Sequence, residues 1–338
     1  MILALAVAVA VSLAPSPQLG PANLAIVINT QDPLSRRIGA YYAAQRHIPR
    51  GNITRVSFNY QRDDLPVEQF AAIKTAADRQ LNSNVQAYVL TWARPYKVGC
   101  MSITTAFALG ADQKYCASEC RATAKNPYFN TTDSNSAARL HSTTPAPPPP
   151  RLAMSLAATS FENAKDLIDR GVRSDGSAPA GSAYLVTTQD GARNVRSLEY
   201  PLATRVAQHE FEFNVRAGEP PQSADDVMFY FIGAVAVPGV AAYRFRPGAI
   251  ADHLTSFGGM LTDSPQMSSL RWLEAGATGS YGTVVEPCNM LGKFPNVAVL
   301  LAHYLAGETL IESYWKSVEM PGQGIFLGEP LAAPFRKP

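Results

Sequence analysis

Short apolar runs alternate with amphipathic stretches along most of this chain, and that alternation constrains its fold more than any other feature. Residues 24–29 (LAIVIN) predict a strand, residues 34–45 place apolar side chains at helical spacing, and residues 53–58 predict the next strand. Repeated strand–helix–strand order is typical of a mostly parallel sheet that is covered by helices. The sequence therefore predicts an α/β fold of that kind.

The same periodicity predicts the remaining elements. It predicts helices over residues 67–81, 161–171, 198–209, 268–275, 297–305 and 309–318, and strands over 85–92, 183–188, 227–233, 248–254, 277–285 and 324–327. A chain of 338 residues suits one large or two ordinary domains. We expect an N-terminal α/β half over residues 23–195 and a C-terminal α/β half over residues 196–338.

The periodicity fails between residues 97 and 151. This segment holds three of the four cysteines and the proline run 145–150 (PAPPPP). We interpret it as a long irregular insertion that is pinned by disulfides and ended by a stiff polyproline spacer. A PxxP ligand for a partner domain is the alternative interpretation of the proline run.

An uncharged apolar run opens the chain. Residues 2–14 (ILALAVAVAVSLA) are followed by Pro15, Ser16 and Pro17, an order typical of a signal peptide and its cleavage zone. We assign residues 1–22 to a signal peptide and leader, with a buried N-terminal helix or strand as the alternative. As a helix this run would span about 20 Å, less than the roughly 30 Å bilayer core. No later run is long enough either, so we predict no stable membrane span after signal cleavage.

The cysteines Cys100, Cys116, Cys120 and Cys288 indicate disulfide bonds in an exported protein, periplasmic or extracellular. Four cysteines allow three pairings, and we expect at least one bridge to tie the insertion to the region of Cys288. A metal half-site at Cys116-x3-Cys120 is an alternative, although no second cysteine pair or nearby histidine completes it. A reactive thiol at Cys288, which follows a predicted strand, is another.

Composition and the absence of known motifs exclude several classes of partner and cofactor. The chain is 46% hydrophobic and 17% charged with a net charge of +2, so neither nucleic acid nor an anionic membrane is expected as a partner. The motifs GxSxG, GxxxxGK(S/T) and HExxH are absent, and no GxGxxG follows the first strand. We therefore predict no cofactor and no metal.

Polar residues at the ends of the predicted strands are the candidate site residues, because ligands of parallel sheets bind beyond the carboxyl ends of strands. The candidates for catalysis are Asp190, His253, Ser256 and Glu286, and those for ligand binding are Trp92, Arg94 and Glu329. Several also have a structural interpretation. Asp190-Gly191 is a natural turn pair, and a histidine in an apolar strand is typical of a satisfied core residue.

The order of motifs resembles that of an uncharacterised family of secreted bacterial proteins. The likeness spans nearly the whole mature chain and ends at Gly328-Glu329-Pro330. Its motifs are Ser35, 39–42 (GAYY), Arg46 with Ile48-Pro49 and Asn52, 88–91 (YVLT) with Pro95, 126–130 (NPYFN), 184–187 (YLVT) with Asp190-Gly191, 245–251 (FRPGAIA) and 276–287 (GATGSYGTVVEP). The resemblance implies secretion and brings little functional knowledge with it.

A more distant likeness concerns residues 196–338. The strands 227–233 and 248–254, the helix to residue 275 and the segment from Gly276 onward resemble the closing half of gingipain-like cysteine peptidases, which share the caspase-type fold. That family ends on a Gly-Asp-Pro to which Gly328-Glu329-Pro330 is similar. Its catalytic dyad is a His-Gly after the first of these strands and a nucleophilic Cys after the second, where the imidazole takes the thiol proton.

The dyad is absent from this chain. Ala234 and Val235 follow the first strand, and His253, Thr255 and Ser256 stand at the end of the second, whereas Cys288 lies one strand later. The likeness thus implies the caspase/gingipain-like fold and argues against a cysteine peptidase.

Two functions remain open. The first is a non-catalytic or degenerate caspase/gingipain-like protein that binds a peptide, glycan or protein partner, and the missing dyad favours it. The second is a hydrolase with a rearranged site, in which His253 acts as acid or base and Asp190 or Glu286 orients it. Arg94 or Ser256 would then hold the substrate.

Overall fold

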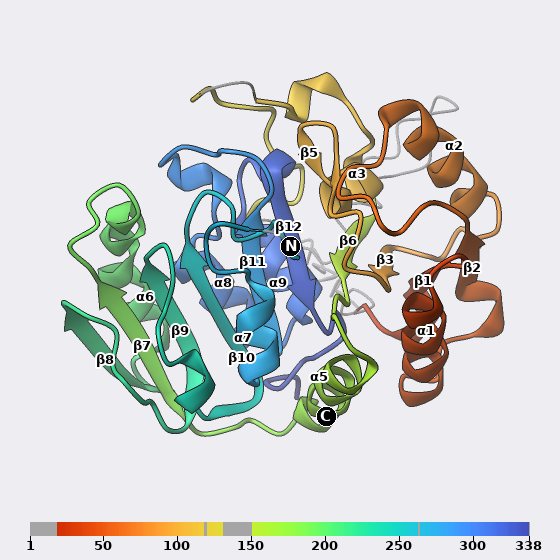
Figure 1. The fold of residues 1–338 in the computed structure, drawn as a ribbon. Helices are drawn as coiled ribbons and strands as arrows, with labels where there is room; N and C mark the ends of the chain where they lie inside the picture. The colour runs from red at the N-terminus through yellow and green to blue at the C-terminus, as the bar shows by residue number, and fades with distance from the viewer. Residues whose placement is uncertain (1–18, 118–119, 131–150, 263, 338) are drawn as a thin grey trace, which may run out of the picture.

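One sheet of ten strands forms the centre of the molecule (Figure 1). The structure, a computed structural model, describes residues 19–117, 120–130, 151–262 and 264–337. Across the sheet the strands are β2 (Ile53–Val56), β1 (Leu24–Asn29), β3 (Ala87–Leu90), β6 (Leu152–Ser155), β12 (Gly324–Gly328), β11 (Gly279–Thr283), β10 (Phe245–Leu254), β9 (Val227–Gly233), β7 (Ser182–Thr187) and β8 (Glu212–Ala217).

The sheet is mostly parallel, as predicted. Strands β2, β1, β3 and β6 are parallel to one another, and so are β11, β10, β9, β7 and β8. Strand β12 joins these two groups: it runs antiparallel to β11, with Phe326 opposite Tyr281, and it meets β6 at the pair Leu327 and Ser155. The interior strands β1, β3, β6, β9, β11 and β12 are buried along their whole length, which is why their sequences read as continuous apolar or small-residue runs.

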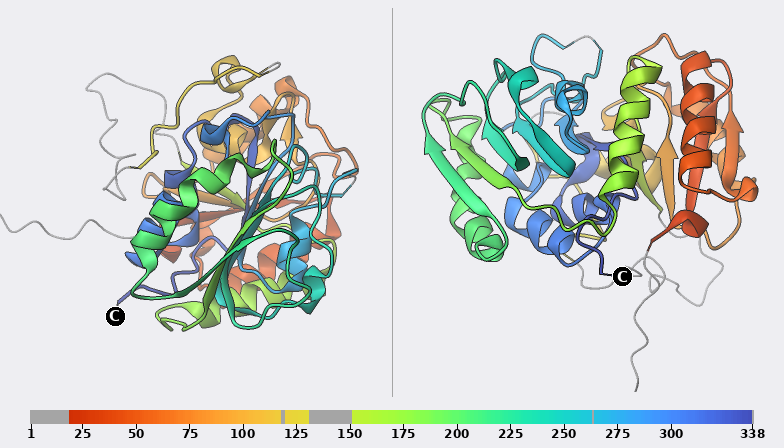
Figure 2. Two further views of the ribbon diagram at one scale, coloured as in Figure 1. Left: turned by 90° about the vertical axis from the view of Figure 1, so that its left-hand side faces the viewer. Right: turned by 90° about the horizontal axis from the view of Figure 1, so that it is seen from below.

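Helices cover both faces of the sheet (Figure 2). On one face α1 (Pro33–Gln45) packs on α5 (Phe161–Ser174), and α5 packs on α7 (Leu270–Ala275). On the other face α6 (Tyr200–Ala207) packs on α8 (Val297–Leu305), and α8 packs on α9 (Leu310–Ser317). The helices α2 (Val67–Asp78) and α3 (Ile103–Leu109) lie over the N-terminal strands and meet through the rings of Phe70 and Phe107.

Local sequence explains where several helices begin. The side chain of Asp32 accepts a hydrogen bond from the Leu34 N–H at the start of α1, and Pro33 occupies the first helical position. Helix α9 starts with a capping box, in which Thr309 and Glu312 each bond the other's backbone N–H. These caps satisfy donors that a helix leaves unpaired at its first turn.

The predicted insertion differs from expectation at its start. Residues 97–109 form a small antiparallel hairpin, β4 (Lys97–Val98) with β5 (Met101–Ser102), followed directly by α3. Almost every side chain of α3 is buried, so its sequence has no polar face from which helical periodicity is recognisable. The proline run 145–150 and the apolar N-terminal run 2–14 lie outside the described residues.

The division of the chain at residue 195 remains a prediction. Strand β7, from the predicted N-terminal half, lies between β8 and β9 in the same continuous sheet as the C-terminal strands. None of the helices that the structure describes is long and apolar enough to cross a bilayer.

Candidate active site region

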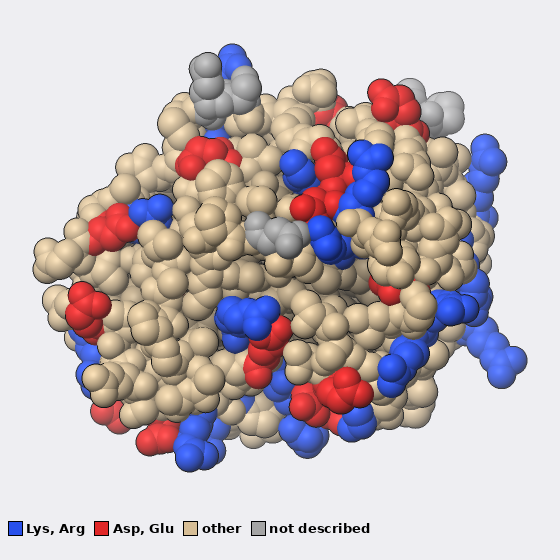
Figure 3. All heavy atoms as spheres, viewed as in Figure 1, with Lys and Arg blue, Asp and Glu red and all other residues tan. Residues whose placement is uncertain are grey.

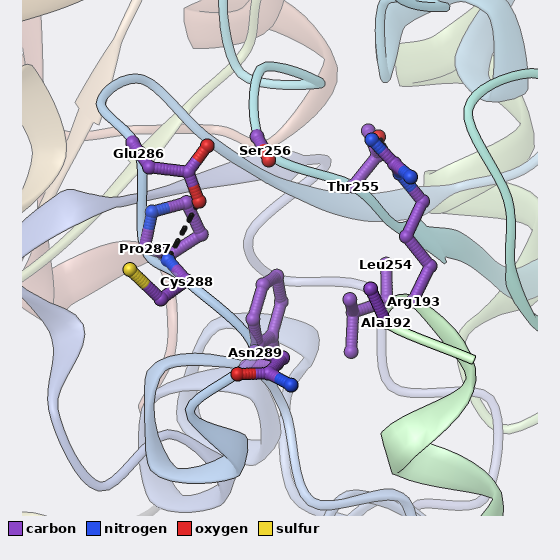
Figure 4. Close-up of a pocket in the computed structure, with 10 residues that line it drawn as sticks. Ala192, Arg193, Leu254, Thr255, Ser256, Glu286, Pro287, Cys288 and Asn289 are labelled. Carbon is purple, nitrogen blue, oxygen red and sulfur yellow. Dashed lines mark hydrogen bonds between the residues drawn. The ribbon is translucent and has the colours of Figure 1, made fainter. Parts of the chain in front are cut away.

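A pocket of about 220 Å³ lies beyond the ends of β10 and β11, next to the loop that follows β7 (Figure 4). Because β7, β9, β10 and β11 are parallel, their carboxyl ends share one edge of the sheet. The pocket is lined by Ala192, Arg193, Leu254, Thr255, Ser256, Glu286, Pro287, Cys288, Asn289 and Phe294. It is therefore built from three segments that are far apart in the sequence.

The pocket combines an apolar base with a polar rim. Leu254 and Phe294 are each 3% exposed, whereas Glu286 and Asn289 are exposed. One carboxylate oxygen of Glu286 accepts the backbone N–H of Cys288 at 2.7 Å, and this carboxylate forms no ion pair within the described residues. Figure 4 shows the Ser256 hydroxyl and the Glu286 carboxylate on the same side of the pocket.

Arg193, in contrast, is bound to other side chains of the protein. Its guanidinium bonds the Asp190 carboxylate at 2.7 Å and donates from Nε to the Thr255 hydroxyl at 3.0 Å. Partial burial acts to raise the pKa of Asp190, but the hydrogen bonds and charge of Arg193 outweigh it and hold that pKa below its ordinary value. Asp190 thus lies beside the pocket and serves mainly to fix Arg193.

His253 lies in the core, away from the pocket lining. Side chains alternate between the faces of β10, and His253 points with Ala251 toward Trp272 of α7. Its Nδ1 accepts the Trp272 Nε1–H at 2.9 Å, so the neutral ring carries its proton on Nε2, which donates to the Met267 carbonyl at 3.0 Å. Burial lowers the pKa of His253 to about 4. Both ring nitrogens are used, and neither is available to take a proton from a substrate.

The preceding residue, Asp252, points to the opposite face and forms a buried ion pair. Its carboxylate lies 2.5 Å from the Arg196 guanidinium, and the two side chains are 1% and 2% exposed. Arg196 also donates to the Ile232 carbonyl of β9 at 3.2 Å. Because Arg196 follows Arg193 by three residues, this pair fixes the loop that forms one wall of the pocket to β9 and β10.

A second buried charge near the pocket escaped the sequence analysis. Lys293, next to Phe294, is fully buried, and its Nζ has no hydrogen-bond partner in the described structure. Burial lowers the pKa of this amine, and the charge of Glu286 opposes the shift. Nothing in the local sequence distinguishes Lys293 from a surface lysine. Asp252 differs, because an aspartate inside the apolar strand 248–254 indicates a buried ion pair, here with Arg196.

The cysteines form two disulfides, as predicted from their number. Cys100 pairs with Cys116, and Cys120 pairs with Cys288, so no cysteine in the described residues is free. The second bridge ties the segment after α3 to the loop after β11, which confirms the expected link between the insertion and the region of Cys288. The thiol that lines the pocket is therefore oxidised. The described residues also contain no cluster of three or more His, Cys, Asp or Glu side chains that would hold a metal.

The three ligand-binding candidates lie elsewhere, each with partners of its own. Arg94 donates to Asp63 at 2.6 Å, and the indole of the buried Trp92 donates to the Pro95 carbonyl at 3.1 Å. Glu329 is fully buried and accepts from the Tyr42 hydroxyl at 2.6 Å and from Arg46 Nε at 3.0 Å. Of the sequence candidates, the pocket brings together Ser256 and Glu286, with Asp190 nearby through Arg193.

Comparison with known proteins adds the fold family. No family model matches the sequence, and no curated protein matches it. Among solved structures, the chain is similar to the arginine-specific cysteine proteinase gingipain R, with a TM-score of 0.54 and 9% identity over 95% of this chain and 80% of that one. The fold is that of the gingipain-like peptidases. A structure described only as a protease also matches, with a TM-score of 0.46 and 10% identity over 94% of this chain and 79% of that one.

Within this gingipain-like fold, the end of β9 is closed to a side chain. Gly233 packs directly against the backbone of Arg193, and a Cβ at this position would overlap the Arg193 carbonyl oxygen. Ala234 and Val235 follow β9, and Thr255 and Ser256 follow β10, so no histidine stands after the first strand and no cysteine after the second, where the resemblance implies a dyad.

Proposed function

We propose that this protein is an exported, non-catalytic relative of the gingipain-like peptidases that binds a peptide segment in the pocket beyond β10 and β11. One observation carries the proposal: Cys288, the thiol that lines the pocket, is bonded to Cys120, while His253 is buried with both ring nitrogens engaged. The pocket thus has a built shape and specific polar groups but no thiol–imidazole pair. The two disulfides support export to an oxidising compartment.

The charge of the pocket indicates which side chain it accepts. The Glu286 carboxylate is exposed at the rim without an ion-pair partner among the described residues, and Leu254 and Phe294 supply an apolar base. A cavity of about 220 Å³ has room for one long side chain rather than a whole peptide. Arginine and lysine combine an apolar stem with a charged head, so a basic side chain of the bound peptide matches both parts of the pocket.

The test uses two blocked, fluorescein-labelled peptides that differ only in carrying arginine or its neutral isostere citrulline. We expect the wild-type protein to bind the arginine peptide more tightly, and Glu286→Gln to abolish that preference while keeping the hydrogen bond to Cys288. Glu219→Gln is the matched control, because Glu219 is also exposed but does not line the pocket. This variant should keep the preference for the arginine peptide. Equal affinity of wild type for both peptides, or binding to a glycan panel alone, would overturn the assignment.

The hydrolase alternative rests on Ser256 and Glu286, whose functional groups face the same pocket. In that case the carboxylate would act as the base for the serine hydroxyl without help from His253. Loss of ester or peptide turnover in Ser256→Ala would support it, and absence of turnover in wild type would exclude it.

A further inference from the structure

A second hollow, of about 400 Å³, lies at the far edge of the sheet between β2 and α2. Its walls are partly apolar, with the buried Val56 and Ile73 beside the exposed Ala72 and Ala76 of α2. The small side chains at residues 72 and 76 keep the helix surface low, so that the hollow is open to solvent. We call this feature the β2–α2 groove.

Arginines without acidic partners surround one end of the groove. Arg55 lines it, and Arg79 follows Ala76 by three residues at the end of α2. The Gln80 side chain bonds the backbone of Arg55, so the residue that follows Arg79 contacts the strand that carries Arg55. Both are exposed, and neither forms an ion pair within the described residues.

Basic side chains also lie on other residues near β2, although Glu68, which precedes the groove-lining Gln69, is exposed and acidic. Arg50 and Arg62 are also exposed and have no ion-pair partner among the described residues, whereas the acids Asp63 and Asp78 are neutralised by Arg94 and Lys74. In Figure 3 basic side chains lie along the right-hand margin beside β2, whereas acidic side chains lie at the upper right, over one end of α2. A basic patch of this kind attracts an acidic partner and speeds its association.

The free edge of β2 is partly blocked. Gln80 accepts the Arg55 N–H at 3.3 Å and donates to the Arg55 carbonyl at 3.4 Å, so its amide occupies the groups that an added strand would use. A ligand here is therefore held by side chains rather than by strand addition.

From these observations we infer that the β2–α2 groove is a docking site for an acidic segment of a partner protein that inserts one apolar side chain. Because the walls of the groove are partly apolar, a ligand that fits it needs an apolar group as well as negative charge. A polyanionic glycan lacks such a group. The hollow is concave, which disfavours the flat surface of an anionic membrane. This inference is independent of the proposed function, because the groove lies at the edge strand β2, whereas the pocket lies beyond β10 and β11, and the two share no lining residue.

The experiment uses the full mature protein and a fluorescein-labelled peptide in which one leucine is flanked on each side by glutamates. Two control peptides replace the glutamates by glutamine or the leucine by serine. We expect saturable binding of the first peptide that weakens with added salt, and weaker binding of both controls. The double variant Arg55→Glu/Arg79→Glu should lower the affinity about tenfold or more.

Matched variants keep the result interpretable. Arg205→Glu introduces the same change at an exposed arginine of α6, near the other end of the sheet, and should leave binding unchanged. Arg55→Gln/Arg79→Gln, a milder pair, should give an intermediate loss with an unchanged circular dichroism spectrum. Equal loss in Arg205→Glu, equal binding of the glutamine peptide, or binding to phosphatidylglycerol vesicles without binding to the peptide would each overturn the inference.

Discussion

The two halves of the sheet use the polar residues at their strand ends in different ways. After β1 and β3, Asn29, Ser35 and Thr91 are buried and bond to one another or to nearby backbone, for example Ser35 to Thr91 at 2.7 Å. After β10 and β11, Ser256 and Glu286 instead face a pocket. Polar residues after a strand therefore mark a site only where the chain itself leaves them without partners.

Removal of the disulfides is expected to give the largest difference between the two halves of the sheet. Cys120 and Cys288 are 168 residues apart, whereas Cys100 and Cys116 are 16 apart. On chain entropy alone, removing the disulfide that closes the longer loop, by Cys120→Ser/Cys288→Ser, should lower the free energy of unfolding by about 5 kcal/mol. Removing the disulfide that closes the shorter loop, by Cys100→Ser/Cys116→Ser, should lower it by about 3 kcal/mol. Urea unfolding measures both losses. Only the first variant should also weaken binding of the arginine peptide, and equal effects on binding would contradict the comparison.

The Arg196–Asp252 pair supports the pocket end from within the core. Arg196→Met leaves the Asp252 carboxylate buried without its partner and should lower the free energy of unfolding by about 3–5 kcal/mol. Arg196→Met/Asp252→Leu removes both charges and should recover most of that loss. If the double variant is no more stable than the single one in thermal unfolding, the buried-charge explanation is wrong.

The core position of His253 predicts a particular pH dependence of stability. Its pKa is about 4 in the folded protein, against an ordinary value of 6.5, because burial disfavours the charged ring. As the pH falls from 6.5, the unfolded chain takes up this proton before the folded protein does, so stability is lost down to about pH 4. The shift corresponds to about 3 kcal/mol.

His253→Gln should remove this part of the pH dependence, although the variant is less stable than wild type near neutral pH because it loses the hydrogen bond that His253 accepts from Trp272. The measurement is the difference in unfolding free energy between wild type and variant, taken at several values of pH. A constant difference across the range would show that His253 titrates normally and is exposed to solvent.

The smallest effect is expected at the other strand end. Arg94 and Asp63 form a partly exposed ion pair, with side chains 33% and 31% exposed. Arg94→Ala should change stability by less than about 1 kcal/mol and leave binding of the arginine peptide unchanged. A clear loss of peptide affinity in this variant would show that Arg94 contributes to binding and that the two halves do not differ as described.

Much of the fold follows from local sequence. Strands 24–29 and 227–233 and helix 297–305 appear with the predicted bounds, because long buried strands and a strongly apolar helix carry a clear pattern. Two strands were not predicted: β6, which has only four residues (LAMS) next to the proline run, and β8, an exposed edge strand. In these short or exposed strands the pairing with neighbours decides the conformation, and a single sequence does not show it.

The site was less predictable than the fold. Ser256 and Glu286, chosen because each follows a predicted strand, line the same pocket, since parallel strands place their carboxyl ends together, and their role there remains a prediction. Alternation along β10 sends His253 to one face and Asp252 to the other, and only the packing of Trp272 and Arg196 decides what each meets there. The pairing of Cys288 with Cys120 likewise depends on a contact between segments 168 residues apart.

The central claim is that the pocket binds without catalysis, and the most direct test is to incubate the arginine peptide with a stoichiometric amount of protein and analyse it by mass spectrometry. We expect the peptide to be recovered intact from wild type, from His253→Gln and from Ser256→Ala alike, under conditions in which fluorescence anisotropy shows it bound. Cleavage by wild type that disappears in Ser256→Ala would contradict binding without catalysis and identify the pocket as a hydrolase site.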